Sequence, residues 1–273
     1  MERPSHVNID GDIILYAVGF AAQRTVYLSD GKTFEDKRDV EEYAKKYDTE
    51  IETAVQPEPV EHCLSSVKRL LARIVEGSGC STHTVLLSGS TNFRTSVAKL
   101  QEYKGNRISE KPYHYLNIRN YLVDVKHAEI VEGEEADDQL SVRCVQQGHM
   151  IATIDKDLRN TAGWHFNWDK DEEPVEINEV EADRNFYTQL LTGDSTDNIP
   201  GLFKLTGKRA TAKSKAPIQE MTDPADMYKH VYKVYADAEC ANVADTLLEI
   251  GRLLWMRRED GETWTPPTEV DNG

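Results

Sequence analysis

The sequence has few cysteines, and none of them has the spacing of a metal site. The chain contains four, Cys63, Cys80, Cys144 and Cys240, without a CxxC pair or a cysteine–histidine pattern. Zinc sites need closely spaced ligands, and structural disulfides persist mainly outside reducing compartments. We therefore expect reduced thiols in a cytosolic protein and no zinc.

Long hydrophobic runs are missing as well. No apolar stretch approaches the roughly 18 residues of a membrane span, and the start, MERPSHVNIDGD, lacks the apolar region of a signal peptide. We expect a cytoplasmic protein without a membrane partner. At 273 residues, the chain is long enough for one large α/β domain and a smaller appendage.

Positive charge is scarce overall, because 32 Lys and Arg residues face 48 Asp and Glu residues, a net charge of −16. Phosphate binding usually leaves a basic footprint, so the total argues against a nucleic-acid partner. The distribution argues the other way. Residues 88–120 hold six basic residues and two acids, and residues 201–217 hold five basic residues and no acid. Either segment alone is also explained as a solvated helix face.

Acidic residues gather in tight groups. They are Glu132, Glu134, Glu135, Asp137 and Asp138, then Asp155 and Asp157, then Asp194 and Asp197. Carboxylates this close repel one another, so a fold that gathers them normally holds a cation, and oxygen ligands select Mg²⁺ or Mn²⁺. Each group alone has an ordinary alternative, as first-turn helix residues or as turn residues.

Alternating apolar strands and helices predict a mostly parallel sheet with flanking helices. Strands are expected at residues 6–10, 84–87, 128–131, 150–154 and 175–177, and helices at 13–22, 60–75, 115–123, from the acid cluster onward, and through most of the chain after residue 186. Residues 29–59 form a charged, poorly periodic insert. Ligands of such sheets bind outside the carboxyl ends of the strands. Asp10, Ser88, the acid cluster and Asp155 all follow strand ends, so we expect them to converge at one edge of the sheet. Ordinary roles in helix first turns or in turns do not explain this convergence.

A converging carboxylate set suits phosphate chemistry. Two Mg²⁺ ions about 4 Å apart can activate water and stabilise the charge that develops on a phosphodiester. Such chemistry requires no histidine base. The eight histidines show no metal spacing, and we expect them to be structural or exposed.

Five motifs, in order along the chain, resemble the flap endonuclease and 5′→3′ exonuclease family of PIN-like nucleases. They are IDGD at Asp10, FRTSVAKLQEYKGNR at residues 93–107, EGEEADDQL around Asp137, IATIDKDL around Asp155 and GDSTDNIPG from Gly193. The small size and the ending LLWMRREDGETWTPP resemble the bacteriophage branch.

The resemblance implies a fold and a domain division. A PIN-like α/β nuclease domain would occupy residues 1–180, with a short helical arch over the active site at about residues 90–115. Residues 181–273 would form a helical DNA-binding region that contains a helix-three-turn-helix.

The resemblance also implies residue roles. The ligands of the first metal would be Asp10, Glu135, Asp137 and Asp138, and those of the second Asp155, Asp157, Asp194 and Asp197. Lys104 and Arg107 would contact the scissile phosphate and the 5′ strand. Among substrate-binding residues, Tyr103 would stack on a base, Arg94 would guide the strand, and Lys208, Arg209 and Lys213 would hold duplex phosphates.

The implied activity is a metal-dependent 5′→3′ exonuclease with 5′ flap endonuclease activity. Its cofactors would be two Mg²⁺ ions, with Mn²⁺ able to substitute. Its partners would be DNA with 5′ ends, flaps or nicks, and RNA/DNA hybrids where primers are removed. We expect a monomer that serves phage DNA replication or degradation in the host bacterial cytoplasm. The alternatives are a PIN-type ribonuclease and a non-catalytic DNA-structure-binding protein.

The sequence departs from the family pattern in two places. Ser88-Gly89-Ser90 stands where many members carry an aspartate, and Lys204-Leu205-Thr206-Gly207 stands where the family often has GIG. The second departure leaves open whether a K⁺ ion binds at the helix-three-turn-helix, because glycines let the backbone approach such an ion closely.

We hypothesise that Asp12, two residues after Asp10, partly substitutes for the aspartate missing at Ser88; the alternative is that Asp12 caps the following helix. Replacement by Asp12→Ala should then raise the Mg²⁺ concentration needed for cleavage, because one ligand would be lost. A metal titration of the cleavage rate measures this. Unchanged Mg²⁺ dependence would contradict the hypothesis.

Overall fold

A six-stranded sheet forms the centre of the computed structural model, which describes residues 2–107 and 110–267. The strand order is β6 (Glu129–Val131), β5 (Thr82–Ser88), β1 (His6–Asp10), β7 (Met150–Ala152), β8 (Gly163–Phe166) and β9 (Val175–Ile177). All neighbours are parallel except β9, which runs antiparallel to β8. The predicted mostly parallel sheet is confirmed, and β8 is a strand that the sequence did not reveal.

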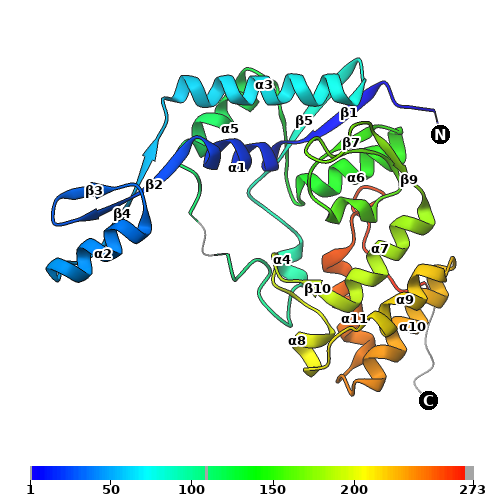
Figure 1. The fold of residues 1–273 in the computed structure, drawn as a ribbon. Helices are drawn as coiled ribbons and strands as arrows, with labels where there is room; N and C mark the ends of the chain where they lie inside the picture. Colours follow the sequence, from blue (N-terminus) through cyan, green and yellow to red (C-terminus); the bar gives the residue numbers. More distant parts are fainter. Residues whose placement is uncertain (1, 108–109, 268–273) are drawn as a thin grey trace.

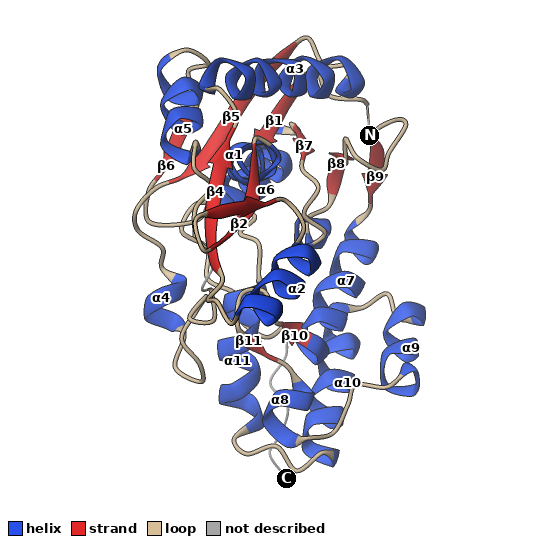
Figure 2. Cartoon of the chain, turned by 60° about the vertical axis from the view of Figure 1, so that its left-hand side comes forward, coloured by secondary structure: helices blue, strands red, loops and turns tan. Residues whose placement is uncertain are grey.

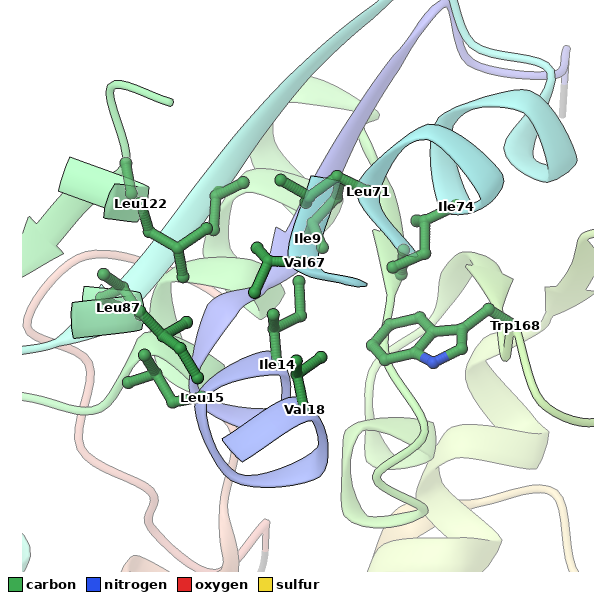
Figure 3. Packing of buried hydrophobic residues seen from close by; sticks show 14 of the residues in the cluster. Ile9, Ile14, Leu15, Val18, Val67, Leu71, Ile74, Leu87, Leu122 and Trp168 are labelled. Carbon is green, nitrogen blue, oxygen red and sulfur yellow. The ribbon is translucent and has the colours of Figure 1, made fainter. Parts of the chain in front are cut away.

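Helices cover both faces of this sheet because its central strands are apolar on both sides (Figure 1). One face carries α1 (Gly11–Ala21), α3 (Val60–Ser78) and α5 (Tyr115–Asp124), and the other carries α6 (Ala136–Gln147). Figure 3 shows the first core, where Ile9 of β1 lies among Ile14, Val67 and Leu71 from the helices. The strand β1 is therefore held from both sides, which fixes the position of Asp10 at its end.

The chain after the sheet is helical and has a core of its own. It comprises α7 (Glu179–Thr192), α8 (Leu202–Thr206), α9 (Ala212–Glu220), α10 (Pro224–Asp237) and α11 (Val243–Leu254), with the short strands β10 (Gly193–Asp194) and β11 (Ile199–Pro200). Phe186, Leu190, Tyr235 and Trp264 are buried in this core. Tyr103, from the first part of the chain, is buried there too. The division at residue 180 stays a prediction, and this contact crosses it.

The expected helix, turn and helix after residue 201 are present as α8 and α9. Gly207 ends α8 with a φ of +73°, a left-handed conformation that glycine adopts without strain. The basic residues Lys208 and Arg209 follow in the exposed turn.

The insert is more ordered than its weak periodicity indicated. It folds as β2 (Gln23–Ser29), β3 (Lys32–Phe34), α2 (Lys37–Tyr47) and β4 (Glu52–Pro57), with the antiparallel order β3-β2-β4. It projects from the end of α1, away from the sheet (Figure 1), and comes forward in Figure 2. Only Val26, Ser29 and Val40 are buried within these four elements, so no long apolar pattern could mark them.

The segment expected to form a helical arch is largely irregular. In its described residues, 90–107 and 110–115, the helix α4 (Arg94–Val97) is a single turn, and α5 begins only at Tyr115. Residues 108–109 of the expected arch lie outside the described residues. The chain from 98 to 107 instead follows the helical part, where the Lys104 N–H donates to the Asp197 carbonyl at 2.9 Å. Gly105 disfavours a helix in this segment, and Lys104 has a left-handed φ of +57°, which an α-helix does not contain.

The cysteines are free thiols, and Cys63, Cys80 and Cys144 are buried. Burial raises the pKa of the Cys144 thiol to about 12. Across the described ranges, no helix is both long and apolar enough to cross a membrane.

Replacement of Ile9 by alanine should destabilise the protein by about 2–5 kcal/mol, because a fully buried side chain of the central strand would leave a cavity. Urea denaturation measures this free energy of unfolding. Ile130→Ala is the matched control, since Ile130 lies on the edge strand β6 and is 45% exposed. Equal losses for both variants would contradict the assignment of β1 as the core strand.

Candidate active site

Carboxylates from separate segments meet at the carboxyl edge of the parallel sheet, as the strand order predicts. They line two adjoining hollows of about 120 and 320 Å³, here called the narrow and the wide hollow. Both hollows are lined by Lys104, Arg107, Glu135, Asp137 and Asp155. The narrow hollow adds Asp157, Asp194 and Asp197, and the wide hollow adds Asp10, Asp12 and Ser88.

Asp10 is positioned at the end of β1 by two hydrogen bonds. Its carboxylate caps α1 by accepting from the Ile13 N–H at 3.1 Å, and it accepts from the Thr153 hydroxyl at 2.7 Å. Burial, followed by the charge of Asp12, raises the pKa of Asp10 to about 7. Burial and the charges of Asp10 and Asp155 also raise the pKa of Asp137 well above its usual value. These carboxyls therefore repel one another in a poorly solvated position.

The pKa values of the carboxyls that line the narrow hollow are also shifted. Burial and a hydrogen bond with Asp194 raise the pKa of Asp157 to about 8. Burial works against ionisation of Asp194, but the bond from Asp157 and the Thr196 N–H, at 2.7 Å, outweigh it and lower its pKa. Burial also raises the pKa of Asp155. Raised pKa values at Asp155 and Asp157 show that the negative charge of this hollow is poorly compensated.

Residues 103–107 bring positive charge to the same place. Lys104 forms an ion pair with Glu135 through its Nζ and lies 3.6 Å from Asp197 Oδ2. Arg107 Nη2 contacts Asp197 Oδ1 at 2.5 Å. The structure thus brings both residues expected to act on the phosphate into the site. Tyr103 differs from its expected role, because it is only 8% exposed and its hydroxyl contacts Glu135 and Asp197, so it is not free to stack on a base.

Two predicted roles are not supported by the positions of the side chains. Asp138, expected to bind metal, is fully buried and borders neither hollow; Arg94, expected to guide DNA, borders the narrow hollow but is only 1% exposed. Two Arg94 nitrogens contact the Asp138 carboxylate at 2.5 and 2.9 Å. Arg94 also donates to the carbonyls of Leu253 and Trp255. A buried guanidinium requires such a partner, so the pair joins α4, α6 and the end of α11.

The three-residue spacing between Glu135 and Asp138 could have indicated that Asp138 caps a helix. Glu135 is the N-cap of α6, and Asp138, three residues later, accepts from the Glu135 N–H in a capping box. Glu132 also lies outside the two hollows, since it accepts from the hydroxyl of Thr91 and the N–H of Ser90. Glu134 pairs with Arg257, a residue for which the motifs gave no indication.

Ser88 and Asp12 are joined in the wide hollow. The Ser88 N–H donates to Asp12 at 3.1 Å, and the Ser88 hydroxyl accepts from the Ala136 N–H at 2.9 Å. The helix cap is Asp10 and not Asp12, which removes the capping alternative for Asp12. Thr153, which holds Asp10, was missed because a threonine after a strand has no distinctive sequence signal.

The basic residues of the α8–α9 turn lie outside the lining of both hollows. Lys208, Arg209 and Lys213 are exposed. Arg209 lies over the Phe203 ring, 5.1 Å from its centre, and Lys208 is 3.2 Å from Glu239. Their exposed charges are available to a polyanion.

The donor set has the chemistry of a hard-cation site, because it consists of carboxylate oxygens that repel one another. As the side chains stand, no three or more His, Cys, Asp or Glu residues within the described ranges form a group that could hold a metal ion. The Lys104 ammonium group, between Glu135 and Asp197, is a stand-in cation. The residues therefore fit Mg²⁺ or Mn²⁺ by charge and by donor type.

Comparison with known proteins agrees with this arrangement. No protein-family model and no curated protein matches the chain. Solved structures do match, and three bacteriophage T5 structures are among them. The chain has the T5 flap endonuclease fold. The D15 protein co-crystallised with metal ions has a TM-score of 0.52 at 16% identity, over 90% of this chain and 88% of that one.

Two further T5 structures give the same result. A 5′-exonuclease mutant has a TM-score of 0.53 at 15% identity, covering 91% of this chain and 88% of that one. A D15 flap endonuclease complex with DNA and metal ions has a TM-score of 0.54 at 17% identity, covering 90% and 88%. At such identities the likeness establishes the fold, which confirms the predicted α/β class.

The raised pKa values of Asp10 and Asp157 predict a pH-dependent effect of Mg²⁺ on stability. Both values lie above those of the unfolded chain, so the stabilising effect of protonation is lost as pH rises through about 7 to 8. Saturating Mg²⁺ should therefore raise the Tm more at pH 8 than at pH 6. Thermal unfolding with and without EDTA, at matched ionic strength, measures the difference. An equal Mg²⁺ effect at both pH values would contradict this prediction.

Proposed function

We propose that this chain is a metal-dependent nuclease that hydrolyses DNA phosphodiesters at free 5′ ends and at 5′ single-stranded branches. The observation that carries the proposal is the convergence of Asp10, Asp137, Asp155 and Asp194 with Lys104 at one sheet edge. The fold is shared with T5 5′-exonuclease structures over about nine tenths of the chain.

The carboxylates would hold two divalent ions, Mg²⁺ or Mn²⁺. Asp10, Asp12, Glu135 and Asp137 are the candidates nearest the wide hollow, and Asp155, Asp157, Asp194 and Asp197 those nearest the narrow one. When bound, the ions supply an activated water and stabilise the charge of the scissile phosphate.

Lys104 and Arg107 would supply further positive charge to the phosphate. Both now contact carboxylates that a bound cation would neutralise. Once Glu135 and Asp197 are neutralised, the attraction that holds the two basic side chains weakens, and a phosphate becomes the stronger partner. The same two residues would thus pair first with carboxylates and then with the phosphate.

Duplex DNA would be held by the α8–α9 turn. Lys208, Arg209 and Lys213 present charge without a fixed base-reading geometry, which suits recognition of backbone structure instead of sequence. The substrates proposed are therefore flaps, nicks and 5′ ends, and RNA/DNA hybrids at primers. A role in phage replication or DNA degradation, as a monomer in the host cytoplasm, belongs to the same proposal.

A non-catalytic DNA-structure-binding protein is the second candidate function. It is favoured by one observation, namely that Lys104 and Arg107 contact Glu135 and Asp197 and so oppose metal binding there. A PIN-type ribonuclease is less well supported, because the helical part with its basic turn extends the chain beyond the carboxylate site.

Cleavage of a 5′-flapped DNA duplex, labelled separately at each end, tests the proposal. We expect release near the branch or stepwise from the 5′ end with Mg²⁺ and none with EDTA. Asp155→Ala should reduce the rate by about 100-fold or more, the scale on which loss of one charge-stabilising group acts. Asp155 is the informative position because it lines both hollows.

Asp226→Ala is the matched control, since Asp226 is an exposed aspartate on α10, and its rate should equal that of the unmodified protein. Tight flap binding without cleavage in Mg²⁺ or Mn²⁺ would replace the nuclease with the binding protein. Cleavage of single-stranded RNA but not of flaps would replace it with a ribonuclease.

A further inference from the structure

The Tyr103 hydroxyl lies between carboxylates from two separate parts of the chain. Its oxygen is 2.8 Å from Glu135 Oε2 and 2.8 Å from Asp197 Oδ2. Glu135 belongs to the start of α6 beneath the sheet, whereas Asp197 belongs to the turn between β10 and β11. One side chain therefore joins the sheet-borne carboxylates to those of the helical part.

Each of these carboxylates has its second oxygen on a basic side chain. Glu135 Oε1 pairs with Lys104, and Asp197 Oδ1 contacts Arg107 at 2.5 Å. The shortest contacts of the two basic side chains are thus to the oxygens that Tyr103 does not contact, and Lys104 also lies 3.6 Å from Asp197 Oδ2, which it shares with Tyr103. A cation can replace Lys104 and Arg107 without displacing Tyr103.

The position of Tyr103 does not depend on its hydroxyl alone. Its ring is buried in the helical core. Its neighbours are bound to the turn that carries Asp197: the Lys104 N–H donates to the Asp197 carbonyl at 2.9 Å, Asn198 donates to the Glu102 carbonyl at 2.8 Å, and Asn106 donates to the Ser195 carbonyl at 2.7 Å. The backbone places the ring, and the hydroxyl is left to act on the carboxylates.

A hydroxyl has one proton, so it can donate to only one of the two carboxylates at a time. The second close contact between oxygens needs positive charge nearby, which Lys104 provides. Burial and the charge of Glu135 raise the pKa of Tyr103 far above its usual value, so the hydroxyl keeps its proton. The Tyr103 hydroxyl therefore lies as a neutral donor between the carboxylates of Glu135 and Asp197, and Lys104 supplies the positive charge beside them.

We propose that Tyr103 is a positioning residue for metal binding: its hydroxyl fixes Glu135 and Asp197 relative to one another and leaves their other oxygens for a cation. The inference rests on the proposed function and adds how its two carboxylate groups are brought together. Lys104 and Arg107 contact those oxygens here, and Glu135 and Asp197 would offer them to a divalent ion.

The substitution Tyr103→Phe isolates this role, because phenylalanine keeps the ring that packs in the helical core but lacks the hydroxyl. We expect Mn²⁺ binding without DNA, measured from the electron paramagnetic resonance signal of free Mn²⁺, to weaken about tenfold, which corresponds to about 1.4 kcal/mol. The Mg²⁺ concentration that gives half-maximal cleavage should rise similarly, while the rate at saturating Mg²⁺ should recover.

Tyr113→Phe is the matched control, since Tyr113 lies in the same part of the chain and is 64% exposed. It should bind Mn²⁺ as the unmodified protein does. Thermal unfolding of both variants shows whether each is folded, and flap binding in EDTA shows whether the hydroxyl contacts DNA.

Unchanged Mn²⁺ affinity in Tyr103→Phe would overturn the positioning role, and so would a loss of flap binding in EDTA without a loss of Mn²⁺ affinity. If the unmodified protein binds Mn²⁺ but cleaves nothing, a weaker Mn²⁺ affinity in Tyr103→Phe still supports the positioning role, and only the nuclease fails. If the unmodified protein does not bind Mn²⁺, both proposals fail.

Discussion

Repulsion among buried carboxylates explains how the basic side chains of this site are arranged. The parallel sheet brings Asp10, Asp137 and Asp155 to one edge, where water cannot screen them well. The pKa values of Asp10 and Asp157 are raised as a result, and the cations Lys104 and Arg107 pair with Glu135 and Asp197. A site that must import positive charge in this way is a site prepared for a cation.

Neighbouring acids in the cluster at residues 132–138 have different roles, some in structural contacts and others in the lining of the hollows. Glu132 holds a loop, Glu134 pairs with Arg257, and Asp138 pairs with Arg94. Only Glu135 and Asp137 of the five line the hollows. The Arg94–Asp138 pair fixes the start of α6, and because Glu135 is the cap of that helix, the structural and the chemical acids depend on each other.

The sequence predicted the sheet and the convergence well, because both follow from apolar periodicity and from the rule that parallel strands end at one edge. It did not separate Asp137 from Asp138, since successive helical residues point about 100° apart and motif spacing does not say which one faces the site. It did not predict the hydroxyl contacts of Tyr103 either, because they join residues 32 and 94 positions away. The strands of the insert at residues 29–59 were not predicted for a different reason. They are exposed on much of their surface, so their residues do not alternate in polarity.

The placement of Lys104 has a consequence for the order of events at the site. While Glu135 and Asp197 are ionised and no metal is bound, Lys104 is attracted to them and not to a phosphate. If a divalent ion bound at Glu135 and Asp197, as proposed, their charge would be neutralised and the attraction that holds Lys104 would weaken. Positive charge would then be released toward the substrate only after the metal has arrived. A phosphodiester that reached the site before the proposed metal would meet repelling carboxylates and a lysine already engaged, so the ion pairs of Lys104 and Arg107 would delay substrate binding until the metal had bound.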